Sequence, residues 1–185
     1  LSDADVLVLS DYNKGAITDA GAQQLISAAK GNGIPIICDP KLTGLNRTEG
    51  ATCVLFEIRG LELTRRRLGL ASSAETARDL ISKYNWEALV VLGGVQGLWL
   101  YTADAEHHIP CLLDDARQII GLHDAAAVAM AAALSQGASL HDAATLAHAA
   151  CETILGAEEG QEVLDRRTLS ASMDERAWQM QVSDR

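Results

Sequence analysis

The sequence predicts an α/β domain built on a mostly parallel sheet with helices on both faces. Short continuous apolar runs with β-branched members, at 6–9 and 34–38, are typical of strands buried on both faces of a parallel sheet. Helical segments separate the strands, and the chain continues from residue 124 as alanine-rich helix. Strands that alternate with helices and are followed by a helical end define a layered α/β domain.

The first strand is predicted over 6–9, and a polar loop at 11–15 follows it. Thr18 or Asp19 can cap a helix that runs to about Lys30. The second strand, over 34–38, completes a strand–helix–strand unit, which implies a right-handed parallel crossover.

The middle of the chain continues the alternation. A third strand is expected at 52–56, followed by a helix over 74–84 that Ser72 or Ser73 opens. Three further strands are expected at 88–92, 98–102 and 108–112. The turn at 93–97 is short, which favours antiparallel pairing of the strands on either side.

From Asp124 one helix is predicted to run to about Gln136, and a second, capped by Ser139, to about Leu155. We therefore expect a core domain over 1–157 and a tail over 158–185 that is helical or partly ordered.

Composition limits the partners of the chain. Its 185 residues, 48% of them hydrophobic, suit one domain of moderate size. The net charge of −10 comes from 25 acidic and 15 basic residues, and the dense basic run at 65–67 is placed on a short polar helix. We expect no nucleic-acid partner, because phosphate-backbone binding needs a concentrated basic face.

The cysteines are widely spaced and form no CxxC pair, so no zinc site is predicted. His107 and His108 are adjacent and point to opposite faces of a strand, which disfavours a metal site there. Free cysteines fit a reducing compartment, and neither a membrane-spanning run nor a signal peptide is visible. We expect a cytoplasmic protein without membrane contact. The first residue is Leu1 rather than Met, which suggests a piece of a longer protein.

The segment from Gly121 to Asp124 is the strongest candidate for chemistry. A glycine turn before a long helix leaves backbone N–H groups and a partial positive charge that favour a phosphate or a developing oxyanion. Asp124 at this terminus can act as a base toward a substrate hydroxyl. The alternative is that Asp124 is a first-turn acid that only stabilises the helix.

Polar clusters also follow several of the strands, at 10–12, 39–41 and 93–97, and Asp124 follows the strand-like residues 118–120. Ligands of open parallel sheets bind beyond the carboxyl ends of the strands. We expect these loops to converge on one edge of the sheet, although each loop alone also fits an ordinary turn.

The order of these motifs resembles the ribokinase-like (pfkB-type) sugar kinases, and within them the heptose-7-phosphate kinases of lipopolysaccharide core synthesis. The similar segments lie at 5–15, 33–41, 91–97, 121–124 and 147–150. The resemblance covers about residues 3–157. It implies a ribokinase-like layered fold from which the N-terminal lid and sugar-binding portion are missing.

The resemblance implies ATP-dependent phosphorylation of a sugar phosphate, with Mg²⁺ as cofactor. Asp124 would be the catalytic base, and Gly121, Leu122 and His123 would form the anion hole. The other site residues that it implies are Gly94, Gly97, His148 and Lys41 for the nucleotide, and Asp11 and Lys14 on the substrate side. Lys41 also fits a solvated surface lysine. An exposed sheet edge would favour a homo-oligomer or a partner chain.

Two motifs depart from the family pattern. Leu122 and His123 replace the expected Ala and Gly, and a non-glycine residue resists positive φ, so we expect His123 to crowd the phosphoryl path. The Asn-x-x-Glu motif should fall at 57–60, which reads Glu-Ile-Arg-Gly, with Glu62 two residues further on. A catalytically inactive kinase remnant that binds nucleotide or serves assembly is therefore the alternative. A hydrolase or another phosphate-binding enzyme is a third possibility.

Overall fold

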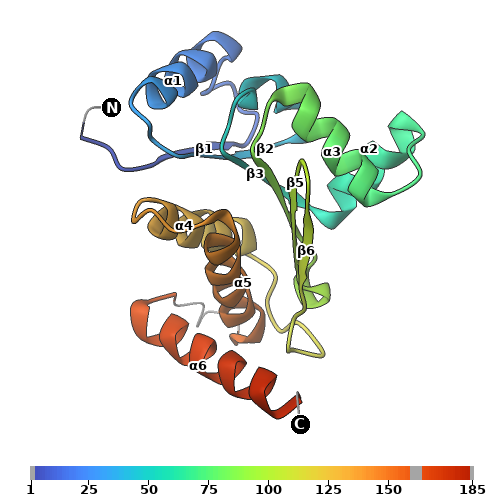
Figure 1. The fold of residues 1–185 in the computed structure, drawn as a ribbon, viewed down its shortest axis with the longest axis vertical. Helices are drawn as coiled ribbons and strands as arrows, with labels where there is room; N and C mark the ends of the chain where they lie inside the picture. Colours follow the sequence, from blue (N-terminus) through green and yellow to red (C-terminus); the bar gives the residue numbers. More distant parts are fainter. Residues whose placement is uncertain (1–2, 159–163, 184–185) are drawn as a thin grey trace.

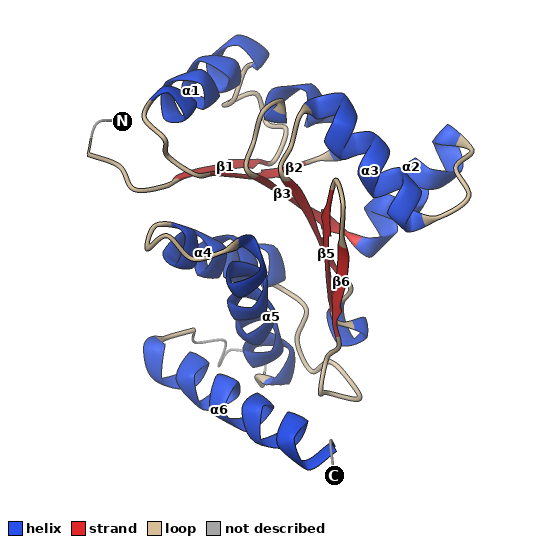
Figure 2. Ribbon diagram, in the orientation of Figure 1, coloured by secondary structure: helices blue, strands red, loops and turns tan. Residues whose placement is uncertain are grey.

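The computed structural model describes residues 3–158 and 164–183, with the side chains of 178–183 left out of the description. The strands in these ranges form one six-stranded sheet. Helices pack on both of its faces, as Figures 1 and 2 show. The predicted α/β class is therefore confirmed.

The strands lie side by side in chain order. Their bounds are β1 Leu7–Asp11, β2 Ile36–Pro40, β3 Cys53–Glu57, β4 Ala88–Leu92, β5 Leu98–Thr102 and β6 Glu106–Ile109. The first four run parallel, whereas β5 and β6 are antiparallel to their neighbours. The short turn between β4 and β5 predicted this reversal correctly.

Four strands differ in their bounds from the prediction, and β3 starts and ends one residue later than expected. The strands expected at 6–9 and 34–38 lie one or two residues later, because the parallel pairing runs from Leu7 and Ile36 as far as Asp11 and Pro40. The strand expected at 108–112 instead covers Glu106–Ile109. It ends before Pro110, which has no N–H group to extend the ladder.

Three helices cover one face of the sheet: α1 Asp19–Gly31, α2 Ile58–Leu68 and α3 Ser73–Tyr84. Ile26, Leu61 and Leu80 of these helices share one core cluster with residues of the parallel strands. The predicted caps are present, since Thr18 Oγ1 accepts from the Gly21 N–H at 3.0 Å and Ser72 Oγ from the Glu75 N–H at 3.1 Å.

The opposite face is covered by α4, Leu122–Leu134, and α5, Leu140–Gly156. Their small residues, Ala126 and Ala144 among them, are fully buried, which lets the two helices approach closely. The last helix, α6, Arg166–Ser183, packs on the outer side of α5 (Figure 1). The division of the chain at residue 157 stays a prediction.

None of the helices in the described ranges combines the length and hydrophobicity needed to cross a bilayer.

Candidate active site

The candidate site begins at the N-terminus of α4. Gly121 has φ 87°, a left-handed conformation suited to glycine, and its carbonyl accepts the Ala125 N–H at 2.8 Å. Among the described residues no side chain caps this terminus, so the N–H groups of the first turn are unpaired. Leu122 and His123 lie within the helix, so the expected conflict with positive φ is wrong. Gly121 alone supplies that conformation here.

Asp124 lies in the first turn of α4 and is exposed. The hydroxyl of Tyr12, in the loop after β1, donates to its Oδ1 at 3.3 Å. The Nζ of Lys41, after β2, lies 5.5 Å from the centre of the Tyr12 ring. The loops after two neighbouring parallel strands thus meet the start of α4, which agrees with the expected convergence on the carboxyl edge.

His123 turns toward the ends of the central strands. Its Nδ1 lies 2.8 Å from Oδ1 of Asp39 in β2, and its Nε2 lies 3.6 Å from Oε1 of Glu57 at the end of β3. The Nε2 atom is buried and has no hydrogen-bond partner among the described residues.

Two cavities border this histidine. One has a volume of about 170 Å³ and is lined by Asp39, Lys41 and Gly60 among others. The other, of about 240 Å³, is lined by Arg59 and Gly94 among others. Glu57 and His123 line both cavities and therefore lie between them.

The glycine turn after β4 contributes in two ways. Gly94 has φ 59°, has open space beside its Cα and borders the larger of the two cavities. Gly97 has φ 95°, and a Cβ there would collide with the backbone carbonyl of Ile109. Gly97 therefore lets the β4–β5 connection pack closely on β6.

The predicted substrate-side residues have different surroundings. Asp11 is buried, and its Oδ2 lies 2.7 Å from Nη1 of Arg47, while its Oδ1 accepts the Asn13 N–H at 2.8 Å. Arg47 also pairs with Asp19 at 2.6 Å, which raises the pKa of Arg47. Both oxygens of Asp11 thus shape the loop after β1. Lys14, in the same loop, is exposed.

His148 lies inside α5 and is 1% exposed. Its Nε2 lies 3.1 Å from the Pro110 carbonyl and 3.3 Å from Oε1 of Glu152. Because both neighbours are acceptors, this nitrogen carries the proton. The imidazole is committed to contacts within the chain, and its expected role toward a nucleotide stays a prediction.

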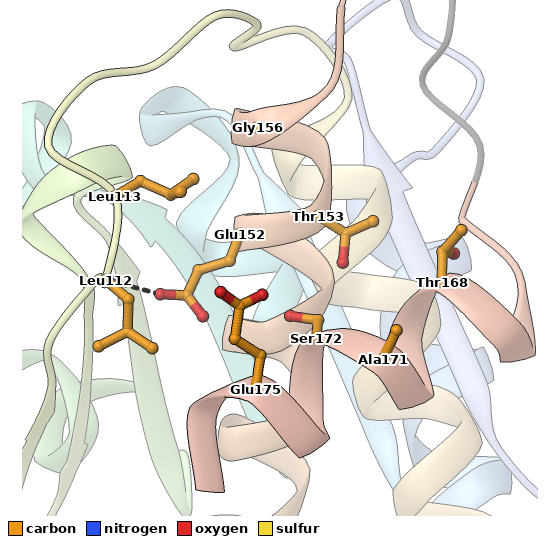
Figure 3. A pocket seen from close by; sticks show the side chains of 9 residues that line it. All are labelled: Leu112, Leu113, Glu152, Thr153, Gly156, Thr168, Ala171, Ser172 and Glu175. Atoms are coloured by element: carbon orange, nitrogen blue, oxygen red, sulfur yellow. Dashed lines mark hydrogen bonds between the residues drawn. The ribbon is translucent and has the colours of Figure 1, made fainter. Parts of the chain in front are cut away.

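Glu152 connects α5 with α6. It accepts the Leu112 N–H at 2.6 Å and pairs with Arg176 of α6 at 3.1 Å. Burial alone raises the pKa of Glu152, but hydrogen bonds from His148 and Leu112, with the charges of His148 and Arg176, lower it to about 2. A cavity of about 380 Å³ lies beside this carboxylate, as Figure 3 shows. It shares no lining residue with the two cavities around His123.

Glu62, the glutamate after the altered 57–60 motif, is engaged within α2. Its carboxylate accepts from Arg65 at 2.7 Å and from Arg66 at 2.8 Å. These hydrogen bonds lower the pKa of Glu62 to about 2. Glu57, in contrast, ends β3 and faces both cavities. Among the described residues, no group of three His, Cys, Asp or Glu side chains is arranged to hold a metal ion.

Sequence reasoning assigned no role to Tyr12, Asp39, Glu57 or Arg47. Tyr12 and Asp39 belong to the polar clusters after β1 and β2, so their position at the edge was available from the sequence. Glu57 was noted only as part of an altered motif. Arg47 gave no signal, because its two partners lie in segments far away in the sequence.

The start of α4 is repeated in α5. Residues 122–126 and 140–144 both read Leu-His-Asp-Ala-Ala. In α5 the preceding residue is Ser139, whose Oγ accepts the Asp142 N–H at 3.1 Å and donates to Oδ2 of Asp142 at 2.7 Å. The same pentapeptide thus begins one capped helix and one uncapped helix.

The chain matches the pfkB family of carbohydrate kinases over residues 1–167. It belongs to this family. The resemblance found in the sequence is therefore confirmed.

The relatives with described functions include proteins named bifunctional protein HldE. The one from Shewanella piezotolerans is 31% identical over 177 residues, which cover 95% of this chain and 36% of the relative. The one from Pectobacterium atrosepticum is 34% identical over 158 residues, which cover 84% of this chain and 33% of the relative. The chain spans about a third of the length of these relatives.

Solved structures support the fold. Ribokinase from Thermotoga maritima superposes with a TM-score of 0.74 at 18% identity, covering 94% of this chain and 58% of ribokinase. Phosphofructokinase-2 from Escherichia coli in complex with potassium superposes with a TM-score of 0.76 at 18% identity, covering 92% and 56%. The chain therefore has a ribokinase-like fold and spans little more than half of these structures.

Proposed function

We propose that this chain carries the nucleotide-side half of a sugar kinase site, which transfers the terminal phosphoryl group of ATP to a hydroxyl of a sugar phosphate. The observation that supports the proposal best is the exposed Asp124 at the uncapped N-terminus of α4, next to His123, which lines two cavities at the carboxyl edge of the sheet. A heptose-7-phosphate is the favoured acceptor, because the sequence resembles that branch and is similar to the HldE proteins.

In this reaction the substrate hydroxyl oxygen forms a bond to the terminal phosphorus, and the bond from that phosphorus to the bridging oxygen of ATP breaks. ADP leaves, and Asp124 takes the proton of the hydroxyl. The hydrogen bond from Tyr12 at 3.3 Å orients the carboxylate. The N–H groups of Leu122, His123 and Asp124 stabilise the charge of the transferring group, because they are fixed in place before the reaction.

The nucleotide would lie along Gly94, Gly97 and α5. The structure of Arabidopsis thaliana ribokinase, which superposes with a TM-score of 0.72, is complexed with ribose and ATP. Lys41, close to Tyr12, would contribute a positive charge toward phosphate. His148 holds the Pro110 carbonyl and would support the wall of this site. Lys14 and the loop shaped by Asp11 would face the acceptor.

The residues present fit Mg²⁺ only together with phosphates. Mg²⁺ is commonly held by one or two carboxylates with substrate phosphates and water. The exposed carboxylate of Glu57 suits that arrangement, and the ion would neutralise phosphate charge.

Coupled ADP release with MgATP and heptose-7-phosphate tests the proposal. We expect turnover that depends on both substrates, together with a thermal shift on adding MgATP alone. Absence of turnover with a clear MgATP shift would favour the alternative of an inactive, nucleotide-binding remnant. Absence of both would contradict the kinase proposal.

We also propose a cytoplasmic location, which cell fractionation tests.

We further propose that the edge of β1 binds a second copy of the chain or a partner chain. Within the described residues β1 pairs only with β2, and Val8 on this strand is 40% exposed. An unpaired strand edge is a template for further pairing. Analytical ultracentrifugation should show an oligomer that Val8→Lys weakens, whereas a monomer at every concentration would contradict self-association.

A further inference from the structure

The two ring nitrogens of His123 have different surroundings. The ionised carboxylate of Asp39 offers only acceptor oxygens, so Nδ1 of His123 carries the proton in the 2.8 Å contact between them. This contact fixes the plane of the ring. The other nitrogen, Nε2, is buried without a hydrogen-bond partner among the described residues. Leaving a buried polar group unpaired is unfavourable, so such an atom calls for an explanation.

The position of the ring indicates which ligand could be the hydrogen-bond partner of Nε2. His123 lies between the cavity that contains Lys41 and the cavity that contains Arg59 and Gly94. Each cavity thus has a cationic side chain in its wall, beside Asp39 and Glu57 in the first and Glu57 in the second, and His123 lines both cavities. A phosphoryl oxygen at this point would accept a hydrogen bond from Nε2 of the doubly protonated ring, in which both nitrogens are donors.

Glu57 is the present neighbour of Nε2, at 3.6 Å, which is too long for a good hydrogen bond. Its side chain is 63% exposed, so it has room to move away from Nε2 when an anion binds. Asp39 is 13% exposed and keeps the ring in place.

We propose that Nε2 of His123 binds the phosphoryl group of the substrates directly, as a side-chain member of the anion site. This inference rests on the proposed phosphoryl transfer and names one further contact residue for it. The ligand class is a phosphate monoester or anhydride.

Three variants of the whole chain separate the functions of the two ring nitrogens. His123→Ala removes both, His123→Asn keeps a donor near Nδ1 for Asp39, and His123→Gln keeps a donor near Nε2. The matched control is His141→Ala, at the same position of the identical pentapeptide in α5, where the side chain is 56% exposed. Melting temperatures check that each variant is folded.

Calorimetry with MgATP and with inorganic phosphate gives the binding result. Because hydrogen bonds to charged groups are strong, we expect His123→Ala and His123→Asn to weaken binding by about tenfold or more. We expect His123→Gln and His141→Ala to stay within about threefold of the wild type. Unchanged or tighter binding by His123→Ala would overturn the inference and would mean that the ring only fills the site.

Nitrogen NMR of the wild-type imidazoles gives a readout that needs no variant. Addition of inorganic phosphate should shift the Nε2 signal of His123 and leave both signals of His141 in place. No shift at saturating phosphate would overturn the inference. Turnover that is unaffected in His123→Ala would contradict the role of His123 and leave the kinase proposal intact. Phosphate binding through Nε2 without turnover would support the role of His123 and contradict the kinase proposal.

Discussion

The helices α4 and α5 begin with the same five residues, Leu-His-Asp-Ala-Ala, in different surroundings. In α5, Ser139 caps the helix, and His141 and Asp142 are 56% and 72% exposed in their side chains, 3.9 Å apart. In α4, Gly121 leaves the terminus open, Asp39 of β2 contacts His123, and Tyr12 of the loop after β1 contacts Asp124.

The comparison shows that the pentapeptide alone does not make a site. The residue before it decides whether the first-turn N–H groups are satisfied, because serine offers a side-chain acceptor and glycine does not. The location of each helix decides which residues contact its His and Asp side chains, because α4, unlike α5, begins at the carboxyl edge of the parallel strands. The α4 terminus is therefore suited to ligand binding, whereas the α5 terminus is suited to stability.

The largest contrast is expected in catalysis. Asp124→Asn should lower phosphoryl transfer by about 10²–10⁴-fold, the usual contribution of a general base. Asp142→Asn, its counterpart in α5, should change the rate by less than about twofold, since an exposed first-turn acid has no contact with the site. Coupled ADP release measures both. Full activity of Asp124→Asn would remove this carboxylate from the mechanism.

A large loss of stability is expected within the body of α5. Glu152→Ala would leave the buried Arg176 without its carboxylate partner, which should lower the free energy of unfolding by about 3–5 kcal/mol. Asp174→Ala, at an exposed position of α6, should change it by no more than about 0.5 kcal/mol. Urea denaturation measures both, and equal effects would show that the ion pair does not hold α6 to α5.

Acid should weaken the same contact. The pKa of Glu152 falls from 4.5 to about 2 in the folded chain, so its contribution is present above pH 4.5 and is lost as pH falls toward 2. The loss is on the order of 3 kcal/mol. Glu152→Gln, which carries no titrating group there, should show a flatter decline in urea denaturation series between pH 5 and pH 2. An identical decline in both proteins would assign the acid sensitivity to other carboxylates.

The smallest effect concerns the caps that distinguish the two helices. Ser139→Ala should lower the free energy of unfolding by about 1 kcal/mol, and Ser139→Gly by only a few tenths, because glycine is tolerated at this position. Thermal denaturation should give the highest melting temperature for the wild type, a slightly lower one for Ser139→Gly and the lowest for Ser139→Ala. If Ser139→Ala leaves the free energy of unfolding unchanged, the hydrogen bond at 3.1 Å contributes nothing to stability.

Much of the fold was predictable because local patterns specify it. Apolar runs predicted the first five strands within two residues, the cap Ser139 was predicted, and Thr18 and Ser72 were each one of two candidate caps. Register was less predictable, as at β1 and β2, because pairing to Asp11 and Pro40 depends on the neighbouring strand rather than on hydrophobicity.

The candidate site was predictable in location but only in part in its contacts. The ends of parallel strands meet at one edge, and Tyr12 in the loop after β1 contacts both Asp124 and Lys41 there, as the expected convergence predicts. The contact between His123 and Asp39 joins residues 84 positions apart, and no local pattern specifies such a pair. The expectation of strain at His123 failed because the helix begins at Leu122, one residue after the glycine.

The most direct test of the central claim compares the two pentapeptides within one molecule. Backbone amide NMR during titration with MgATP should shift the signals of Leu122, His123 and Asp124 and leave those of Leu140, His141 and Asp142 in place. This result is expected because the α4 terminus, unlike that of α5, has N–H groups open to a phosphate. No shift at α4 under saturating MgATP, or equal shifts at both helices, would contradict the account.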